Sequence, residues 1–295
     1  MMDIGIAVIN RMDLLTSCIK SIEDTTGFDY RLTLLDNASS DEAGMRVFAE
    51  TKNMQYIRNQ RNLGIYASYN QIYKATHNDW VAFMHNDVII HEKNWDIRVM
   101  QSIKEIEKAF GKRIGIVGFA GSRGGDIIGA RMDFMSNLRA FEGSHGAELH
   151  GRRMTICEPA IFLDGAVLIC RREMLDKVSG FDERYMCHHI YDYDISMESI
   201  AAGYCNMVVG IDFSHRGGET ACNNEGQLSF DWWAENNENL QGFIEQQKVW
   251  RPELTAEQAI MDYNINRFRF KWSHKLLPCT TDCGYNYIKG RVYRR

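Results

Sequence analysis

The sequence predicts an α/β protein whose central sheet is mostly parallel and flanked by helices. Between residues 4 and 118, short apolar runs alternate with longer segments of helical periodicity. This alternation is typical of βαβ units, in which successive strands lie parallel. The apolar runs also end abruptly in polar side chains, as Phe83-Met84 does at His85, Asn86 and Asp87. Because open α/β sheets bind ligands beyond the carboxyl ends of their strands, these ends are candidate binding sites.

The first part of the chain alternates regularly between the two element types. Residues 4–9 predict a strand, and residues 11–23 predict a helix because their apolar side chains recur on one face. That face comprises Leu14, Leu15, Cys18, Ile19 and Ile22. The same patterns predict strands at 32–35, 54–57, 80–84 and 88–90 and helices at 42–52, 65–76 and 95–110.

The second part is less regular. After a strand at 114–118, residues 119–153 contain seven glycines and predict a long loop insertion, a feature that is usually functional in a compact domain. We then expect a strand at 160–170, helices from 172 and at 194–202, and a last strand at 207–211. A boundary near 217–227 would separate a domain of residues 1–220 from a helical or irregular extension of residues 221–295.

Composition and sequence pattern are those of a soluble protein. No apolar run approaches the roughly 18 residues of a membrane span, and the N-terminus lacks signal-peptide features, so we expect a cytoplasmic location. The eight cysteines are then expected to be reduced. Cys279 and Cys283 could pair or bind metal, but they lack a second pair at zinc-ribbon spacing.

Charge is distributed unevenly along the chain. The net charge is −5, yet residues 264–295 carry eight basic residues, one acid and several aromatic side chains. Such a tail can meet a polyanion, either nucleic acid or an anionic membrane surface at the periphery of a membrane. The alternative is a tail docked against the acidic remainder of the protein.

Three clusters of polar residues follow predicted strands in the first part of the chain. Asp36 heads a turn where its carboxylate can accept hydrogen bonds from a base or a ribose, while Ser40 or Asp41 caps the next helix. Residues 58–64 combine asparagines with Gly64, which permits close backbone approach, and Asn70 lies further along the next helix. Asp87 offers oxygen ligands to a divalent cation, although a simple turn is the alternative for Asn86-Asp87.

A fourth cluster lies beyond the long insertion. Asp164 and Gly165 interrupt an apolar run, and Asp192 precedes Asp194 at the start of a helix. The helix dipole explains Asp194, whereas Asp192 is available as a general base. His215, at the end of the last predicted strand, could ligate a metal, contact phosphate or be structural.

In this order the clusters resemble the family-2 glycosyltransferases of the GT-A fold, especially the rhamnosyltransferase-like branch. The resemblance covers roughly residues 4–220 and rests on five motifs. These are the opening 6–15 segment, Leu35-Asp36-Asn37-Ala38-Ser39-Ser40-Asp41, the Asn59–Asn70 segment, His85-Asn86-Asp87 at the DXD position, and Gly180-Phe181-Asp182-Glu183. Two positions depart from the family pattern, because His85 replaces the first Asp of DXD and Tyr191 stands where Glu is usual.

The resemblance implies a Rossmann-like GT-A domain and a set of site residues. Asp192 would be the catalytic base, and Asp87 with His215 would hold Mn²⁺ or Mg²⁺ on the donor diphosphate. The donor nucleotide would contact Ile9, Asn10, Arg11, Asp36, Asn37, Ser39, Asn62, Gly64, Asn70 and Asn86. The acceptor or the transferred sugar would contact Asp164, Gly165 and Tyr191.

The expected activity is therefore inverting, metal-dependent transfer of a sugar from a nucleotide-diphosphate sugar to a hydroxyl of a glycan or other acceptor, with an anionic acceptor suited to the basic tail. A nucleotidyl or sugar-phosphate transferase would share the fold, but its Arg- and Gly-rich N-terminal signature is missing. The alternative from another class is a non-catalytic nucleotide-sugar or glycan-binding module. Metal-dependent release of nucleotide from a donor distinguishes enzyme from module.

Overall fold

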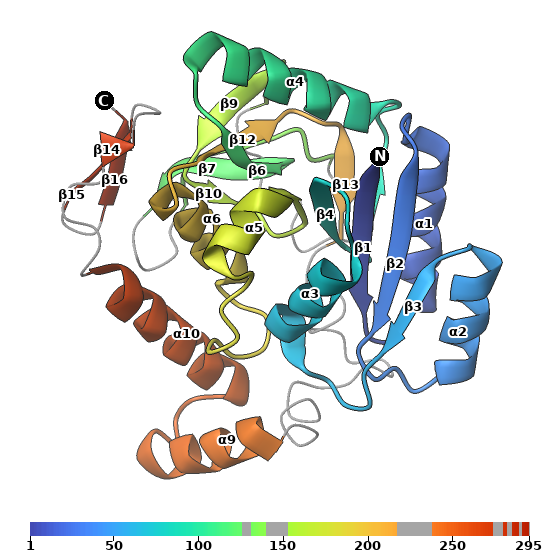
Figure 1. Ribbon diagram of the computed structural model, residues 1–295. Coiled ribbons are helices and arrows are strands. Elements are labelled where there is room, and N and C mark those ends of the chain that lie inside the picture. The colour runs from blue at the N-terminus through green and yellow to red at the C-terminus, as the bar shows by residue number, and fades with distance from the viewer. Residues whose placement is uncertain are drawn as a thin grey trace.

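The computed structural model describes residues 1–125, 131–139, 153–216 and 238–273, together with short strand backbones near the C-terminus. Its main sheet has eight strands in the order β3-β2-β1-β4-β11-β6-β12-β9 (Figure 1). Along the chain these are β1 (Met2–Val8), β2 (Tyr30–Asp36), β3 (Gln55–Arg58), β4 (Trp80–His85), β6 (Ile114–Gly118), β9 (Cys157–Ala160), β11 (Val167–Arg171) and β12 (Cys205–Val209).

Strand direction in this sheet is mostly parallel, as the sequence predicts. β3, β2, β1 and β4 form a continuous parallel block, and β6 pairs in parallel with β12. β11 lies antiparallel between β4 and β6, and β9 is antiparallel to β12. The parallel block brings the carboxyl ends of β1, β2 and β4 to one edge of the sheet.

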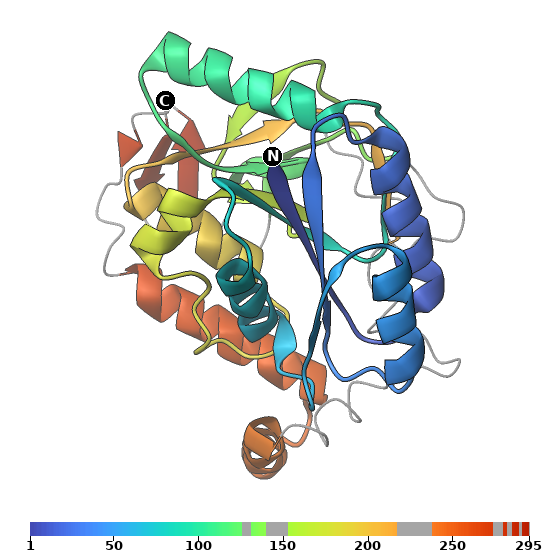
Figure 2. The same cartoon turned by 45° about the vertical axis from the view of Figure 1, so that its right-hand side comes forward.

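Helices cover both faces of the sheet (Figures 1 and 2). On one side lie α1 (Met12–Thr25), α2 (Glu42–Thr51) and α4 (Trp95–Phe110), and on the other lie α3 (Gly64–Ala75), α5 (Arg172–Val178) and α6 (Tyr191–Ala201). In β4, Ala82 and Met84 face the first group whereas Val81 and Phe83 face the second. Because successive strand side chains point to opposite faces, burial on both sides requires the continuous apolar run seen in the sequence.

The strand expected at 160–170 is instead broken into three. β10 (Phe162–Leu163) leaves the main sheet and pairs with β7 (Ala120–Gly125), which also pairs with β8 (Arg131–Ser136). Between β10 and β11 the chain turns, because the Ala166 amide donates to the Asp164 carboxylate at 3.0 Å. The insertion 119–153 therefore contains a β-sheet rather than only irregular loop, while its residues 126–130 and 140–152 lie outside the described part.

A small two-stranded sheet joins distant parts of the chain. β5 (Val88–Ile90) pairs antiparallel with β13 (Phe213–His215), and His215 lies opposite Val88. This pairing returns the chain after β12 to the polar end of β4.

The C-terminal extension is partly helical, with α9 (Glu238–Trp250) and α10 (Ala256–Ser273). It also contains a three-stranded antiparallel sheet of β14 (Thr280–Thr281), β15 (Tyr285–Ile288) and β16 (Arg291–Arg294), which the sequence prediction lacks. β16 lies against β7. The boundary expected at 217–227 lies outside the described residues.

The described part of the basic tail, residues 264–273, packs against the main domain. Phe268 and Trp272 of α10 are buried in the same apolar cluster as α3, α5 and α6. Lys271 Nζ lies 2.6 Å from an Asp194 carboxylate oxygen and 3.2 Å from one of Asp182. For residues 264–273, docking against acidic groups is therefore the alternative that fits.

Two further observations concern the membrane and the cysteines. Among the described helices, none is both long and apolar enough to span a bilayer. Cys18, Cys157, Cys170 and Cys187 are free thiols, but Cys205 is disulfide-bonded. The expectation of reduced thiols is wrong for Cys205.

Candidate functional site

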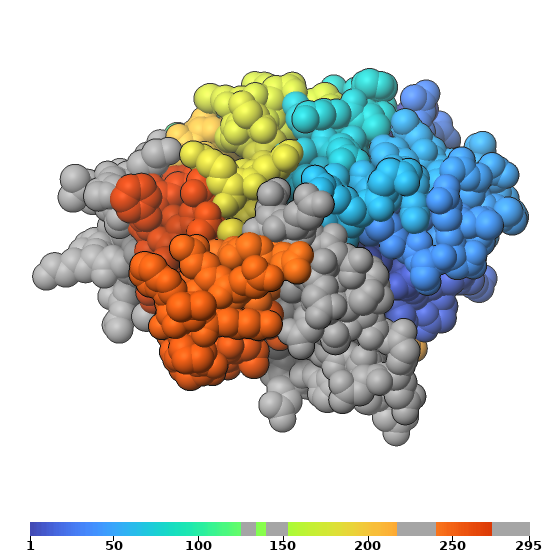
Figure 3. All heavy atoms as spheres, turned by 90° about the horizontal axis from the view of Figure 1, so that it is seen from below, coloured from blue at the N-terminus to red at the C-terminus, as the bar shows by residue number. Residues whose placement is uncertain are grey.

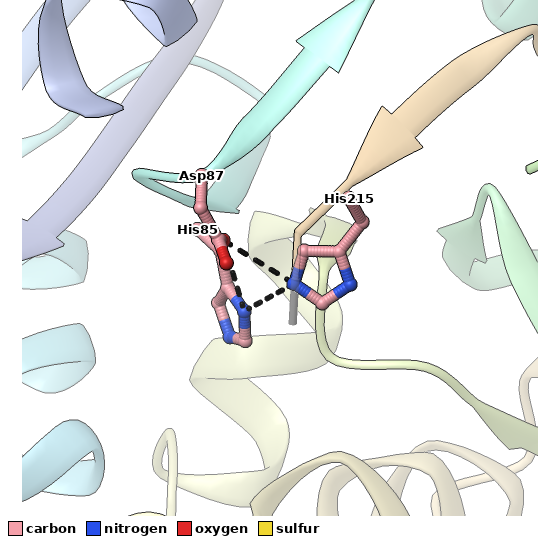
Figure 4. A group of neighbouring side chains, drawn as sticks. All are labelled: His85, Asp87 and His215. Atoms are coloured by element: carbon pink, nitrogen blue, oxygen red, sulfur yellow. Dashed lines mark hydrogen bonds and ion pairs between the residues drawn. The ribbon is translucent and has the colours of Figure 1, made fainter. Parts of the chain in front are cut away.

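Three side chains that can ligate a metal meet at the end of β4. His85 is the last residue of β4, Asp87 lies in the turn before β5, and His215 ends β13 (Figure 4). His215 Nε2 lies 3.2 Å from Asp87 Oδ1 and 3.3 Å from His85 Nδ1, and the latter is 4.0 Å from Asp87 Oδ1. The β5–β13 pairing thus closes a cluster of two imidazoles and one carboxylate.

The electrostatics of the cluster favour cation binding. Asp87 is 7% exposed, and burial alone would raise its pKa, but the adjacent His215 and His85 outweigh burial and lower the pKa to about 2. Burial, reinforced by the neighbouring His215, lowers the pKa of His85. At neutral pH the carboxylate is therefore ionised and the His85 imidazole is neutral, which are the forms that ligate metals.

Tyr191, predicted as an acceptor or sugar contact, contacts His85, one of the three metal-ligand candidates. Its hydroxyl is 2.6 Å from His85 Nε2, so a neutral His85 with Nε2–H donating to Tyr191 presents Nδ1 to the cluster. Gly165 makes room for this contact, because a Cβ built there would lie 1.9 Å from the Tyr191 hydroxyl. Tyr191 at the usual Glu position thus orients a metal-ligand candidate.

Tyr191→Phe should therefore weaken Mn²⁺ binding by about 10–100-fold, the usual loss when a group that orients a ligand is removed. The effect should appear in a Mn²⁺ titration and be small in turnover at saturating Mn²⁺. Tyr30→Phe, on a half-buried ring of β2, is the matched control. Equal Mn²⁺ affinity in the two variants contradicts the orienting role.

Asp192, the predicted base, lies beside this cluster at the start of α6. Its carboxylate accepts hydrogen bonds from the Gly165 amide at 3.1 Å and the Tyr193 amide at 2.9 Å. The same turn contacts the cluster, since the His85 amide donates to the Ala166 carbonyl at 3.0 Å. Asp164 heads that turn and is partly exposed. The structure therefore brings Asp192, Asp164 and Gly165 together with the metal-ligand candidates.

The turns after β1 and β2 are joined to each other. Asn10 N donates to Ser39 Oγ at 2.7 Å, and the Asn10 carboxamide oxygen accepts from Ser40 N at 2.8 Å. Asn10 and Arg11 both adopt positive φ, and Arg11 forms an ion pair with Asp13. Ile9, Asn10, Arg11 and Ser39 therefore form one continuous rim at the carboxyl edge.

Asp36 is fully buried, and protein donors already surround its carboxylate. Ser39 N and the Tyr56 hydroxyl each donate to it at 2.8 Å, and Arg58 forms an ion pair with it. Asp36 thus holds the turn and the Arg58 guanidinium in place. Arg58 begins the polar cluster of residues 58–64, and its ion pair with Asp36 is not predictable from the sequence pattern.

Two of the predicted donor contacts, Asn37 and Asn62, are hydrogen-bonded to each other. Asn37 Oδ1 accepts from the Asn59 side chain and from Leu63 N, and the Asn37 amide donates to Asn62, so these residues tie β2 to the start of α3. Gly64 has φ +77° and approaches the Cys187 carbonyl closely, where a Cβ would lie 2.8 Å away.

Asn70 contacts the segment of residues 181–183. Its amide nitrogen donates to the Phe181 carbonyl at 2.8 Å and to Glu183 at 2.7 Å, and its oxygen accepts from Phe181 N at 2.8 Å. These hydrogen bonds join α3 to the 181–183 segment, and the predicted contact of Asn70 with the donor nucleotide stays a prediction.

Sequence reasoning missed His85 as a metal-ligand candidate. The DXD pattern has an Asp at this position, so the pattern alone predicts no ligand role for an imidazole there. A His two residues before the key Asp, with a second His predicted at another strand end, was the available signal.

The mixed α/β architecture, a large and mostly parallel central sheet flanked by helices, is that of a GT-A domain. The family described as Glycosyl transferase family 2 matches residues 3–158. The chain belongs to this family. A search of curated proteins found no matching sequence.

Solved structures share the fold at low sequence identity. The complex of GalNAc-T7 with UDP, GalNAc and Mn²⁺ is 15% identical, with a TM-score of 0.57 over 93% of this chain and 56% of that chain. S. aureus TarS 1-349 in complex with UDP-GlcNAc is 12% identical, with a TM-score of 0.51 over 93% and 74% of the two chains. The chain spans 43% of the longer S. aureus TarS structure. These likenesses establish the GT-A fold.

Proposed function

We propose that this protein is an inverting, metal-dependent glycosyltransferase that moves a sugar from a nucleotide-diphosphate donor to an acceptor hydroxyl. The observation that carries the proposal is the cluster of His85, Asp87 and His215 at the end of β4, next to the buried carboxylate of Asp192. A cation site and a base side by side at the sheet edge match the two demands of the reaction, a neutralised leaving group and an activated nucleophile.

The cluster fits a divalent cation, and we propose Mn²⁺ over Mg²⁺. Imidazole nitrogen suits transition metals, whereas Mg²⁺ prefers an octahedron of oxygens. His85, Asp87 and His215 would hold the ion, leaving positions for diphosphate oxygens. Asn86, between two of these residues, has a buried amide nitrogen with no hydrogen-bond partner in the described structure. That donor can serve a diphosphate oxygen. When bound, the metal neutralises charge that develops on the departing diphosphate.

We assign the nucleotide to the rim formed by Ile9, Asn10, Arg11 and Ser39, over the floor made by Asp36 and Asn37. Because the Asp36 carboxylate is occupied by three protein donors, its role here is to position Arg58 and the Ser39 turn beneath the base or the ribose. Asn62 and Gly64 shape the rim through their contacts with Asn37 and Cys187.

We assign the base role to Asp192. The amides of Gly165 and Tyr193 hold the Asp192 carboxylate in a fixed position. A carboxylate positioned in this way can act as a general base and accept the proton of an acceptor hydroxyl, whose oxygen then attacks the anomeric carbon opposite the departing diphosphate. A single displacement of this kind inverts the configuration. Asp164 and Gly165 lie on the acceptor side of Asp192.

The motifs resemble those of the rhamnosyltransferase-like branch, and this resemblance supports our proposal that the donor carries a hexose or deoxyhexose. Acceptor selection would lie in residues 119–153 and in the C-terminal extension, and an anionic glycan suits the basic residues there. We retain a cytoplasmic, membrane-peripheral location as part of this proposal.

A screen of nucleotide sugars tests the proposal without knowledge of the acceptor. UDP-, dTDP- and GDP-sugars are each incubated with the protein in Mn²⁺ or in EDTA, and released nucleotide is measured. We expect slow hydrolysis of one donor that stops in EDTA. A non-catalytic binding module would bind a donor but release no nucleotide with any of them, and that result would contradict the proposal.

A further inference from the structure

A second group of metal-ligating side chains lies where the C-terminal extension meets the main domain. His188 and His189 precede α6, and Glu257 lies in the first turn of α10. Ligand atoms from the three residues all lie within 4.8 Å of one another, and His189 Nε2 is 3.6 Å from Glu257 Oε1. The two imidazole rings are adjacent, with centroids 4.1 Å apart.

His189 has an unmet hydrogen-bonding requirement. Its Nε2 atom is buried, and the described residues provide it with no hydrogen-bond partner. Glu257 lies beyond hydrogen-bond range at 3.6 Å. A buried polar atom without a partner destabilises the folded state, and an ion placed between the two residues would supply that partner.

The backbone that carries the two histidines is held on both sides. The Tyr66 hydroxyl of α3 donates to the His189 carbonyl, and the buried Asn264 amide of α10 donates to it at 3.1 Å. Asn264 also pairs with both the amide and the carbonyl of Met186. Cys187 and Ile190, which flank the histidines, adopt φ values of 60° and 71°. The imidazoles are therefore presented by a fixed turn, the preorganisation that a metal site needs.

We propose that His188, His189 and Glu257 bind one Zn²⁺ ion that fastens α10 to the segment leading into α6. Two imidazoles and a carboxylate are a zinc donor set, with a fourth tetrahedral position left for water. Glu257 is about half exposed, so an ion can enter from solvent. No phosphate-bearing donor is needed to complete this site, in contrast to the cluster around Asp87.

At this position the ion would have a structural role, because it would join α10 to the segment before α6. Figure 3 shows α9 and α10 at the surface beside the segment that leads to α6. That segment continues directly into Tyr191 and Asp192, so a clamp at His188 and His189 restrains the residues that orient His85 and flank Gly165. The inference concerns metal binding and stability, and it stands whether or not the protein transfers a sugar.

Zinc stoichiometry in a background that lacks the first cluster tests the proposal. The full-length Asp87→Ala protein is titrated with Zn²⁺ against a chromophoric chelator, alone and combined with His189→Ala, with Glu257→Gln or with the control His77→Ala, at an exposed histidine. We expect His189→Ala to lose one zinc equivalent and His77→Ala to lose none. Zn²⁺ should raise the melting temperature of the background protein and the control but not of the His189→Ala protein.

Circular dichroism checks that each variant folds. Glu257→Gln changes a half-exposed side chain without changing its size, so we expect this variant to fold. Its zinc content can therefore be measured even where His189→Ala fails to fold. It too should lose one zinc equivalent. Equal zinc content in the Glu257→Gln and His77→Ala proteins overturns the proposal. An anomalous zinc peak between His189 and Glu257 in crystals soaked with Zn²⁺ supports it.

Discussion

Asp192→Asn should lower the turnover number by about 10²–10⁴-fold, the range that a positioned general base contributes. The carboxamide keeps the shape of the side chain but removes the basic oxygen that accepts the hydroxyl proton. The Asn oxygen can still accept from Tyr193 N, whereas the amide of Gly165 loses its acceptor. One unsatisfied buried amide costs about 1–3 kcal/mol, so we expect a weakened but intact fold.

Steady-state kinetics with the donor identified in the screen measures the loss of turnover. Calorimetry measures the affinity for the same donor. Donor affinity should remain close to that of the wild type, because Asp192 acts on the acceptor. Asp24→Asn, at an exposed carboxylate of α1 paired with Lys20, is the matched control and should retain full activity. Near-wild-type turnover by the Asp192→Asn protein contradicts the base assignment.

Asp87→Ala should abolish metal-dependent donor binding. The substitution removes the ionised oxygen ligand and leaves two imidazoles. The metal then no longer stabilises the charge on the departing diphosphate, and the loss of several kcal/mol corresponds to a fall of about 10²–10³-fold or more in kcat/KM. Donor affinity in Mn²⁺ should drop to the value that the wild type shows in EDTA. Calorimetry with a nucleoside diphosphate, with and without Mn²⁺, measures the change.

His85→Ala distinguishes this site from the one inferred from sequence. If only Asp87 and His215 held the ion, His85→Ala would leave Mn²⁺ affinity nearly unchanged. Because His85 Nδ1 faces His215 Nε2 at 3.3 Å, we expect a clear loss of Mn²⁺ affinity in this variant as well. A wild-type Mn²⁺ affinity for His85→Ala would remove His85 from the ligand set.

Local periodicity predicted the parallel block of the sheet well. Apolar runs such as Val81–Met84 are buried on both faces, and this kind of run is visible without knowledge of the neighbours. The antiparallel strand β11 and the exit of β10 to a second sheet were not predicted. They depend on the turn at Asp164 and on the pairing of β10 with β7. Hydrophobic periodicity within one segment does not indicate which other strand it pairs with.

The contacts among the candidate site residues could not be predicted from the sequence. Asp87 and His215 were assigned to one ion through the resemblance, and the β5–β13 pairing shows how residues so far apart in sequence meet. The contacts of His85 with His215 and of Tyr191 with His85 were not predicted, because both residues stand where the family pattern has acids. The contact of the Asn70 amide with Phe181 was not predicted, because spacing along a helix does not reveal it.

The most direct measurement is an anomalous difference map at the manganese edge, from crystals soaked with Mn²⁺ and a uridine, thymidine or guanosine diphosphate. We predict one peak within ligand distance of His85, Asp87 and His215, with diphosphate oxygens completing its shell. A bound nucleotide with no manganese between those three side chains would contradict the account.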